Sequence, residues 1–507
     1  MKISQLWAKR NKLGVKILAF AGILLILSVI LYKGSYNAYP TGVHQWSQSD
    51  HYAIALTYAE HGLDYFYPRT YLIEPYMVQA AKPLDTLEGI TAAASPLSEF
   101  LAAITMKISN STEPLTYKLT MLLVFLFGLI FLWLLLYRET QSFFLSAILP
   151  LLIFSMPVIL YYTCNFSPSP PALSLCFIGY YFYFSYLKLQ KFEHFVFAIL
   201  FFYIAMLFRL PFAIALIAVM CQQALSYLFN RRIVWKEVLL VMIVVVLCVV
   251  YHFYDVYLQQ QYGSIFLSKI TLPTAWNDIT EMLAVMTDNR YNVFLPLHFG
   301  ILGILGVNMI LYLIYANKKK ISLLTTFQKR ILLQGSILLF GGICYFLVML
   351  PQYMYHDYYL IDTFLLADTF LLAFLISMVK WKNKYLSWSL SLLLFFALIP
   401  CFIMSYNCVE YHKRTFREYE MIYQRAFILP EMKMIVEKNQ IAKDKIIAIA
   451  DTDLFPANIA EVWTRRLGAW GDDERADYML ITNEKLRNDS ILFQNRLQLV
   501  DSTNKIV

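Results

Sequence analysis

Residues 117–137 read YKLTMLLVFLFGLIFLWLLLY, and this stretch decides the class of fold. Its only charged residue is Lys118, near one end, and its length matches the roughly 20 apolar residues that cross a bilayer as a helix. Similar stretches recur along the chain, which predicts an all-α polytopic membrane protein. We expect about eleven transmembrane helices, over residues 13–32, 117–137, 143–163, 171–187, 194–209, 211–229, 236–257, 293–315, 330–350, 359–379 and 386–406.

The composition of the whole chain agrees with a lipid environment. Of its 507 residues, 59% are hydrophobic and only 15% are charged. A soluble domain carries roughly 25% charged residues to cover its surface. The formal net charge of +8 does not indicate nucleic-acid binding, because Lys and Arg collect in short loops between apolar runs. The cysteines form no CxxC pair, so neither a disulfide framework nor a zinc site is indicated.

The distribution of Lys and Arg predicts an orientation. Basic residues are concentrated at the N-terminus and in every second short loop, which the positive-inside rule assigns to the cytoplasm. Three long polar segments, 33–116, 258–292 and 407–507, then lie outside. We expect a multi-pass protein of the bacterial inner (cytoplasmic) membrane with its chemistry on the periplasmic side. The run at 13–32 is interpreted as a retained first span, with a signal peptide as the weaker alternative.

Two domains are expected. Residues 1–406 form the transmembrane catalytic module, and residues 407–507, where charges return, form a small α/β domain outside the membrane. Within the second domain, residues 409–438 have a helical pattern, and residues 445–450 and 478–481 are typical of buried strands.

The first outer segment, 33–116, contains two helices too short to cross. One is predicted over 47–61, with Ser47 as N-cap and Gly62 as terminator, and another over 95–108, with Ser95 as cap before a proline. Each suits an amphipathic helix at the membrane interface.

The first of these helices begins with Trp46-Ser47-Gln48-Ser49-Asp50. A first span, a large outer loop with two interfacial helices, an early acid in that loop and a terminal outer α/β domain together resemble the GT-C superfamily of membrane glycosyltransferases. The chain more closely resembles the protein O-mannosyltransferase and aminoarabinose-transferase branch (glycosyltransferase family 39-like) and bacterial relatives with a Trp-x-Gln-x-Asp start. The resemblance covers most of the chain in architecture and a few short motifs in residues. It implies transfer of a sugar from a polyprenyl phosphate donor to an acceptor hydroxyl, with inversion.

In that superfamily the loop acid is the catalytic base, and the matching position is Asp50. An acceptor hydroxyl has a pKa far above 7, so a carboxylate must accept its proton as it attacks the anomeric carbon. The alternative is that Asp50 completes a capping box with Ser47. The match leaves Glu60, Glu74 and Glu99 open as other positions for the acid.

A departing phosphate needs fixed positive charge or hydrogen-bond donors. The candidates are Arg69, which matches a Pro-Arg pair that the resemblance implies, Lys82 in the same loop, and Arg209 at the turn between two spans. Arg209 could instead be an arginine that reaches the interface from a helix end.

A cluster rich in histidine and tyrosine, residues 355–359, lies at the outer end of the ninth predicted span. Relatives carry comparable stretches that line the donor cavity, which implies donor-binding roles for His356 and Tyr359. An aromatic belt at the membrane surface is the alternative for the tyrosines. Relatives also carry an acid near Ser169 that this chain lacks, and Asp357 is its possible substitute. Asp357, His44 and Glu99 are therefore secondary candidates.

No cofactor is expected to be required. His44, Asp50, His51, His356 and Asp357 could bind a divalent metal if the two loops meet, but no pair has a recognised metal spacing.

The competing interpretation is a transporter or flippase for a lipid-linked sugar. Asp362 and Asp368, within a predicted span, support it, because intramembrane acids often mark transport pathways. Asp368 could instead pair with Arg209. No inverted repeat is evident.

A scaffolding protein whose outer domain binds a partner is a third hypothesis. The expected partners are a polyprenyl phosphate-linked sugar, a glycan, lipid or protein acceptor, and membrane lipid, with no nucleic acid.

Overall fold

A computed structural model of the chain describes eleven ranges of residues: 3–73, 89–231, 233–266, 276–288, 296–318, 324–353, 356–379, 384–422, 425–450, 457–470 and 473–482. The contacts divide the chain into two compact units. The membrane unit comprises Met1–Tyr36, Met121–Cys248 and Lys269–Val409. The loop unit comprises Asn37–Thr120, Val249–Ser268 and Glu410–Val507. The first loop thus groups with the C-terminal residues, and a domain boundary at residue 407 stays a prediction.

Long helices make up the membrane unit. They are α1 (Ile3–Leu31), α4 (Pro114–Thr140), α5 (Phe143–Phe154), α6 (Pro157–Thr163), α7 (Ser169–Leu189), α8 (Phe192–Phe208), η1 (Leu210–Phe212), α9 (Ala213–Asn230), α10 (Trp235–Tyr262), α11 (Trp276–Asp288), α12 (Pro296–Lys318), α13 (Thr326–Val348), α14 (Leu350–Tyr353), α15 (Tyr359–Ser377) and α16 (Lys384–Ile422). Helices α4, α10 and α16 continue into residues of the loop unit.

Each of the eleven predicted spans overlaps at least one helix of the described residues. Among the described residues, eight helices are long and apolar enough to cross a membrane, and the bent pair α5 and α6 would make a ninth. Helix α8 is shorter, with 17 residues. The chain is a multi-pass membrane protein, and its number of spans stays a prediction.

The third predicted span is broken in the middle. Its halves, α5 and α6, differ in direction by 73°. Pro157 is the first residue of α6, where its missing N–H group and fixed φ suit a helix start but end the preceding hydrogen-bond ladder. Tyr162 lies on the short half, α6. Because of the break, its direction differs from the one it would have in a straight helix.

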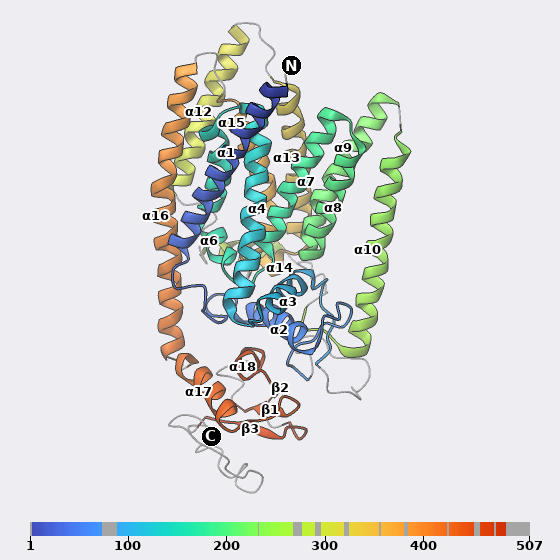
Figure 1. The fold of residues 1–507 in the computed structure, drawn as a ribbon, viewed down its shortest axis with the longest axis vertical. Helices are drawn as coiled ribbons and strands as arrows, with labels where there is room; N and C mark the ends of the chain where they lie inside the picture. The colour runs from blue at the N-terminus through green and yellow to red at the C-terminus, as the bar shows by residue number, and fades with distance from the viewer. Residues whose placement is uncertain are drawn as a thin grey trace. The chain divides into compact units, whose positions relative to one another are not determined.

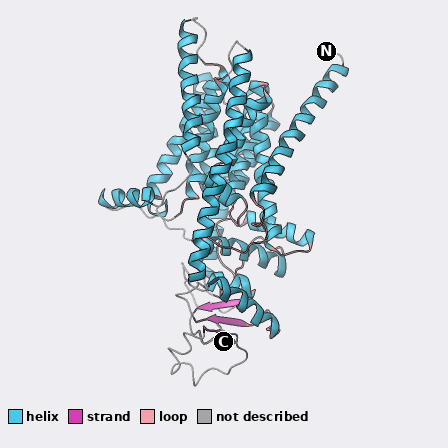
Figure 2. Ribbon diagram, turned by 90° about the vertical axis from the view of Figure 1, so that its left-hand side faces the viewer, coloured by secondary structure: helices cyan, strands magenta, loops and turns pink. Residues whose placement is uncertain are grey.

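Close helix packing fills the interior of the membrane unit. Helices α7 and α8 pack along their length, as do α13 and α15, and long helices run side by side in both ribbon views (Figures 1 and 2). A Cβ atom at Gly128 of α4 would lie 2.3 Å from the Cβ of Ser174 of α7. Glycine is therefore required where these two helices cross, since any side chain there would push them apart.

The loop unit contains the two short helices predicted from the sequence. They are α2 (Gln45–His61) and α3 (Leu97–Ser109), which pack against each other. Gly62 ends α2 with φ 126° and donates its N–H to the carbonyl of Tyr58, as expected. The predicted caps are wrong, because α2 begins two residues before Ser47 and Pro96 rather than Ser95 precedes α3.

The C-terminal part of the loop unit is an α/β structure, as predicted. It comprises α17 (Arg425–Lys438), β1 (Ile446–Ile449), α18 (Ala457–Thr464), β2 (Leu467–Trp470) and β3 (Tyr478–Leu480). The strands form a parallel sheet in the order β2-β1-β3. Strand β2 was not predicted, since its sequence, Leu-Gly-Ala-Trp, lacks the β-branched residues that favour strands. Its partner β1, Ile-Ile-Ala-Ile, is fully buried in the middle of the sheet.

A buried carboxylate ties three helices of the membrane unit together. Glu237, in the first turn of α10, accepts hydrogen bonds from the hydroxyls of Tyr186 and Tyr227 and from the amide of Gln223. Its exposed fraction is 2%. These donors belong to α7 and α9, so the carboxylate satisfies polar groups that would otherwise be buried without partners.

We expect Glu237→Leu to lower the free energy of unfolding by about 2 kcal/mol or more, because several buried donors lose their acceptor at about 1–3 kcal/mol each. Thermal unfolding of the purified protein in detergent measures the change. Glu193→Leu is the matched control, since Glu193 is an exposed first-turn glutamate of α8. Equal midpoints for the two variants would contradict the structural role of Glu237.

Candidate active site

Helix α2 carries Asp50 in its interior rather than at its end. The helix starts at Gln45, and the preceding residue, His44, has a left-handed conformation with φ 58° and makes no side-chain cap. Ser47 therefore lies in the first turn and Asp50 in the second. The capping box between Ser47 and Asp50, one of the two interpretations of this acid, is not formed.

The side chain of Asp50 is buried beside a second acid. Asp50 has an exposed fraction of 3%, and Glu461 of α18 has 1%. Helix α18 packs against α2 within the loop unit. Burial, and then the charge of Asp50, raise the pKa of Glu461 well above its ordinary value. Both effects favour the protonated form of Glu461.

Sequence reasoning missed Glu461. It lies in an eight-residue helix far along the chain from Asp50, and no local motif marks it. Only the crossover from β1 through α18 to β2 brings it onto α2, so no signal in the sequence alone could have found it.

Glu99, a secondary candidate for the acid, has close partners. Its carboxylate is hydrogen-bonded to Nδ1 of His51 at 2.5 Å and accepts from the hydroxyl of Ser98 at 2.8 Å. Glu99 and His51 are both buried. This contact joins α3 to α2 and uses both carboxylate oxygens of Glu99.

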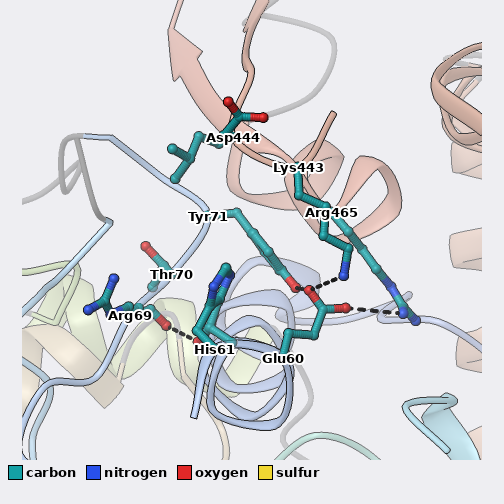
Figure 3. Close-up of a pocket in the computed structure, with 10 residues that line it drawn as sticks. Glu60, His61, Arg69, Thr70, Tyr71, Lys443, Asp444 and Arg465 are labelled. Atoms are coloured by element: carbon teal, nitrogen blue, oxygen red, sulfur yellow. Dashed lines mark hydrogen bonds and ion pairs between the residues drawn. The ribbon is translucent and has the colours of Figure 1, made fainter. Parts of the chain in front are cut away.

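A cavity of about 310 Å³ opens at the C-terminal end of α2, within the loop unit (Figure 3). Its lining residues are Thr57, Glu60, His61, Arg69, Thr70, Tyr71, Lys443, Asp444, Arg465 and Leu467. Asp50 is not among them and lies ten residues before Glu60, about 15 Å along a helix with a rise of 1.5 Å per residue.

Ion pairs organise one wall of this cavity. Glu60 contacts Lys443 at 3.2 Å and Arg465 at 3.6 Å, and it accepts a hydrogen bond from the Tyr71 hydroxyl at 3.1 Å. Figure 3 shows these three side chains directed toward Glu60. Glu60, another alternative for the catalytic acid, is thus engaged with two cations.

Arg69, predicted to bind the donor phosphate, is half-buried and lines the same cavity. Its carbonyl accepts a hydrogen bond from Thr57 Oγ1 at 2.6 Å. Burial lowers the pKa of the neighbouring His61. The negative charge of Glu60 raises it, and the positive charge of Arg69 lowers it. Lys82 and Glu74 lie outside the described residues.

Arg209 forms the central ion pair of the membrane unit. It follows α8 in an extended conformation, and its Nε and Nη2 donate to Oδ2 of Asp362 at 3.0 and 2.7 Å. The rings of Tyr358 and Tyr359 lie 5.1 and 5.5 Å from its Cζ atom. The partner is therefore Asp362 and not Asp368, six residues further along α15.

The other candidates of the membrane unit lie close to this pair. The Tyr162 hydroxyl donates to Oδ1 of Asp357 at 2.5 Å. Nδ1 of His356 is 3.0 Å from the carbonyl oxygen of Gln352, and its ring contacts those of Tyr358 and Tyr359. The structure thus brings Arg209, His356, Asp357 and Tyr359 together, at the start of α15.

Within the part of the chain that the structure describes, no group of three His, Cys, Asp or Glu residues could hold a metal ion. The expectation that no metal is required stays a prediction.

No protein-family model matches the sequence, and no curated protein matches it. Among solved structures, the chain is similar to ArnT from Cupriavidus metallidurans in the apo state, with 9% identity, 96% of both chains covered and a TM-score of 0.48. It is similar to the same protein bound to undecaprenyl phosphate, with 9% identity, 97% of both chains and a TM-score of 0.46. The Archaeoglobus fulgidus oligosaccharyltransferase in the apo form has 14% identity, 90% of this chain and 65% of that one, and a TM-score of 0.46. With TM-scores below 0.5, no substrate and no residue role is carried over from these structures.

We expect Arg209→Met or Asp362→Leu alone to destabilise the protein by about 3–5 kcal/mol, because each leaves one buried charge without its partner. The double variant should be more stable than either single variant, since it removes both charges. Thermal unfolding of the four proteins in detergent forms the cycle that measures this coupling. Losses that simply add would show that the two residues act independently.

Proposed function

We propose that the chain is a membrane glycosyltransferase that transfers a sugar from a polyprenyl phosphate donor to an acceptor hydroxyl, with inversion and with Asp50 as general base. The observation that carries this proposal is the setting of Asp50. Its side chain is buried in α2, takes no part in a helix cap, and acts together with burial to raise the pKa of a second buried acid, Glu461. The Trp46-x-Gln48-x-Asp50 motif supports the same assignment.

The three nearby acids differ in their partners. Glu60 is engaged with Lys443 and Arg465, and both oxygens of Glu99 are hydrogen-bonded to His51 and Ser98. A base must receive a proton from the attacking hydroxyl, and the partners of Glu60 and Glu99 hold their carboxylates in other contacts.

The proposed reaction also needs donors for the departing phosphate. Arg209 suits this role because its bond to Asp362 uses Nε and Nη2 and fixes the plane of the guanidinium beside Tyr358 and Tyr359. His356 and Tyr359 would add neutral donors to phosphate or sugar oxygens. Arg69 and Lys82 remain candidates on sequence grounds.

The proposed orientation follows from the Lys and Arg pattern. In this orientation the N-terminus lies in the cytoplasm, and residues 33–116, 258–292 and 407–507 lie on the opposite side of a bacterial inner membrane. A lipid-borne donor and a glycan, lipid or protein acceptor would meet there.

The transporter hypothesis loses part of its support. Asp362, one of the two intramembrane acids that favoured it, is bound to Arg209. A paired acid needs no role in ion translocation to account for its burial.

We expect Asp50→Asn to lower the rate of sugar transfer by about 10²–10⁴-fold, the usual contribution of a general base. The assay follows radiolabel from polyprenyl phosphate sugars into product, using protein purified in detergent. Asp64→Asn is the matched control, since Asp64 is an exposed acid of the same loop unit. A folded Asp50→Asn protein with wild-type activity would exclude Asp50 as the base.

Reconstitution into vesicles separates the two leading hypotheses. With donor labelled in the sugar, a transferase releases polyprenyl phosphate and forms a labelled product, because the glycosyl bond is cleaved. Movement of the intact labelled lipid between leaflets, without cleavage and regardless of Asp50, would favour a transporter.

A further inference from the structure

Apart from Arg69, the residues that line the cavity at the C-terminal end of α2 have no part in the proposed reaction. The lining comes from the end of α2 and the residues that follow it, from the residues just before β1, and from the turn between α18 and β2, all within the loop unit. The volume of about 310 Å³ is at the lower end of the range for small-molecule sites, about 300–1,000 Å³. The cavity therefore suits a small polar group rather than a polyprenyl chain.

The inner part of the lining is held in place by its own hydrogen bonds. Thr57, Thr70 and Tyr71 are buried. The Tyr71 hydroxyl donates to Glu60 at 3.1 Å, and Thr57 Oγ1 donates to the carbonyl of Arg69 at 2.6 Å. These bonds fix the shape of the cavity and leave the ring of Tyr71 as part of its wall.

Charged groups of both signs surround this inner part. Lys443, Asp444 and His61 are exposed, and Glu60 and Arg465 are half-buried. Glu60 contacts Lys443 at 3.2 Å and Arg465 at 3.6 Å, so one acid stands between two cations (Figure 3). Carboxylates accept hydrogen bonds, whereas ammonium and guanidinium groups donate them. The lining thus offers acceptors and donors at neighbouring positions.

A lining of mixed charge favours a neutral, hydroxyl-rich ligand over an ion. A phosphate would meet Glu60 and Asp444 as like charges, and an amino group would meet Lys443 and Arg465 in the same way. A sugar hydroxyl both donates and accepts, so it can use groups of either sign. The apolar face of a sugar ring also suits contact with an aromatic ring such as that of Tyr71.

The cavity and the proposed base lie on one side of α2. Thr57 and His61, which both line the cavity, follow Asp50 by seven and eleven residues. These spacings are close to two and three helical turns, so the three residues lie above one another on the helix. At 1.5 Å per residue they are about 10 and 16 Å from Asp50 along the axis. A glycan of several rings would extend over that distance.

We propose that this cavity binds a sugar ring of the acceptor, which makes the acceptor a glycan. Glu60 and Asp444 accept hydrogen bonds from sugar hydroxyls, and Lys443 and Arg465 donate to them. No bond forms or breaks in the cavity, so its contribution is binding. The inference rests on the proposed function for the role of the glycan as acceptor, while sugar binding itself can be measured without transfer.

The first test measures binding in the absence of a donor. Saturation-transfer NMR is recorded on the full chain, in a detergent without a sugar head group, with glucose, galactose, mannose and N-acetylglucosamine as probes. We expect at least one probe to receive saturation from the protein, with similar affinity at low and high ionic strength, because the ligand is uncharged. No signal from any of these sugars, or binding of inorganic phosphate in their place, would overturn the proposal.

Two exposed residues of the lining locate the bound sugar. Asp444→Ala and Lys443→Met each remove one charged hydrogen-bond partner, so each should weaken sugar binding roughly tenfold. Asp64→Ala is the matched control, since Asp64 is an exposed acid of the same loop unit outside this lining. Wild-type affinity in both cavity variants would show that the sugar binds elsewhere.

A transfer assay separates this inference from the proposed function. With an oligosaccharide that contains the bound sugar as acceptor, Asp444→Ala should raise the acceptor KM about tenfold and affect kcat far less, because the cavity contributes binding. Asp50→Asn should lower kcat and keep sugar binding in the NMR experiment. Transfer that depends on Asp50 but has a wild-type acceptor KM in Asp444→Ala would overturn the inference and support the proposed function. Sugar binding by a protein that transfers no sugar would support the cavity as a sugar site and count against the proposed function.

Discussion

Burying a charge away from water costs several kcal/mol unless a partner or a lost proton compensates for it, and this constraint accounts for the polar interior of the molecule. The two compact units meet it in different ways. In the membrane unit, the guanidinium of Arg209 is held by Asp362 and flanked by two tyrosine rings, and the carboxylate of Glu237 receives hydrogen bonds from Tyr and Gln side chains. In the loop unit, burial raises the pKa of the Glu461 carboxyl group and so favours its neutral form.

The same constraint limits the chemistry that each acid can perform. A carboxylate whose oxygens are committed to cations or to a histidine is a fixed part of the structure. This is the setting of Glu60, held by Lys443 and Arg465, and of Glu99, held by His51. Asp50 lies on the same helix as Glu60, but its charge acts on another buried acid, Glu461, and raises the pKa of that group. The differences among these acids come from tertiary packing, because their local sequences are equally compatible with an exposed helix face.

The structural features that depend on local periodicity could be predicted from the sequence. Apolar runs located the long helices, Gly62 marked the end of α2, and strands β1 and β3 lie where their patterns placed them, although β3 is only partly buried. The helix starts were predicted less well, since Ser47 and Ser95 are good capping residues that the chain does not use as caps. Strand β2 has a weak intrinsic preference for extended structure and exists because β1 and Tyr71 offer it hydrogen bonds.

The residues of the candidate site also differ in whether local sequence or tertiary packing reveals them. Asp50 and Arg209 could be singled out because a short motif and an isolated charge beside apolar runs are visible in one dimension. Glu461 could not, since about four hundred residues separate it from Asp50 and its significance lies only in its burial. The burial of Glu461 is also the opposite of what its local sequence suggests. An acid on a short helix of a charged domain is normally solvated and ionised, but the contact of α18 with α2 removes water from Glu461 and places a second acid beside it. The cost of that arrangement falls on folding, because a buried carboxyl group has lost its contact with water.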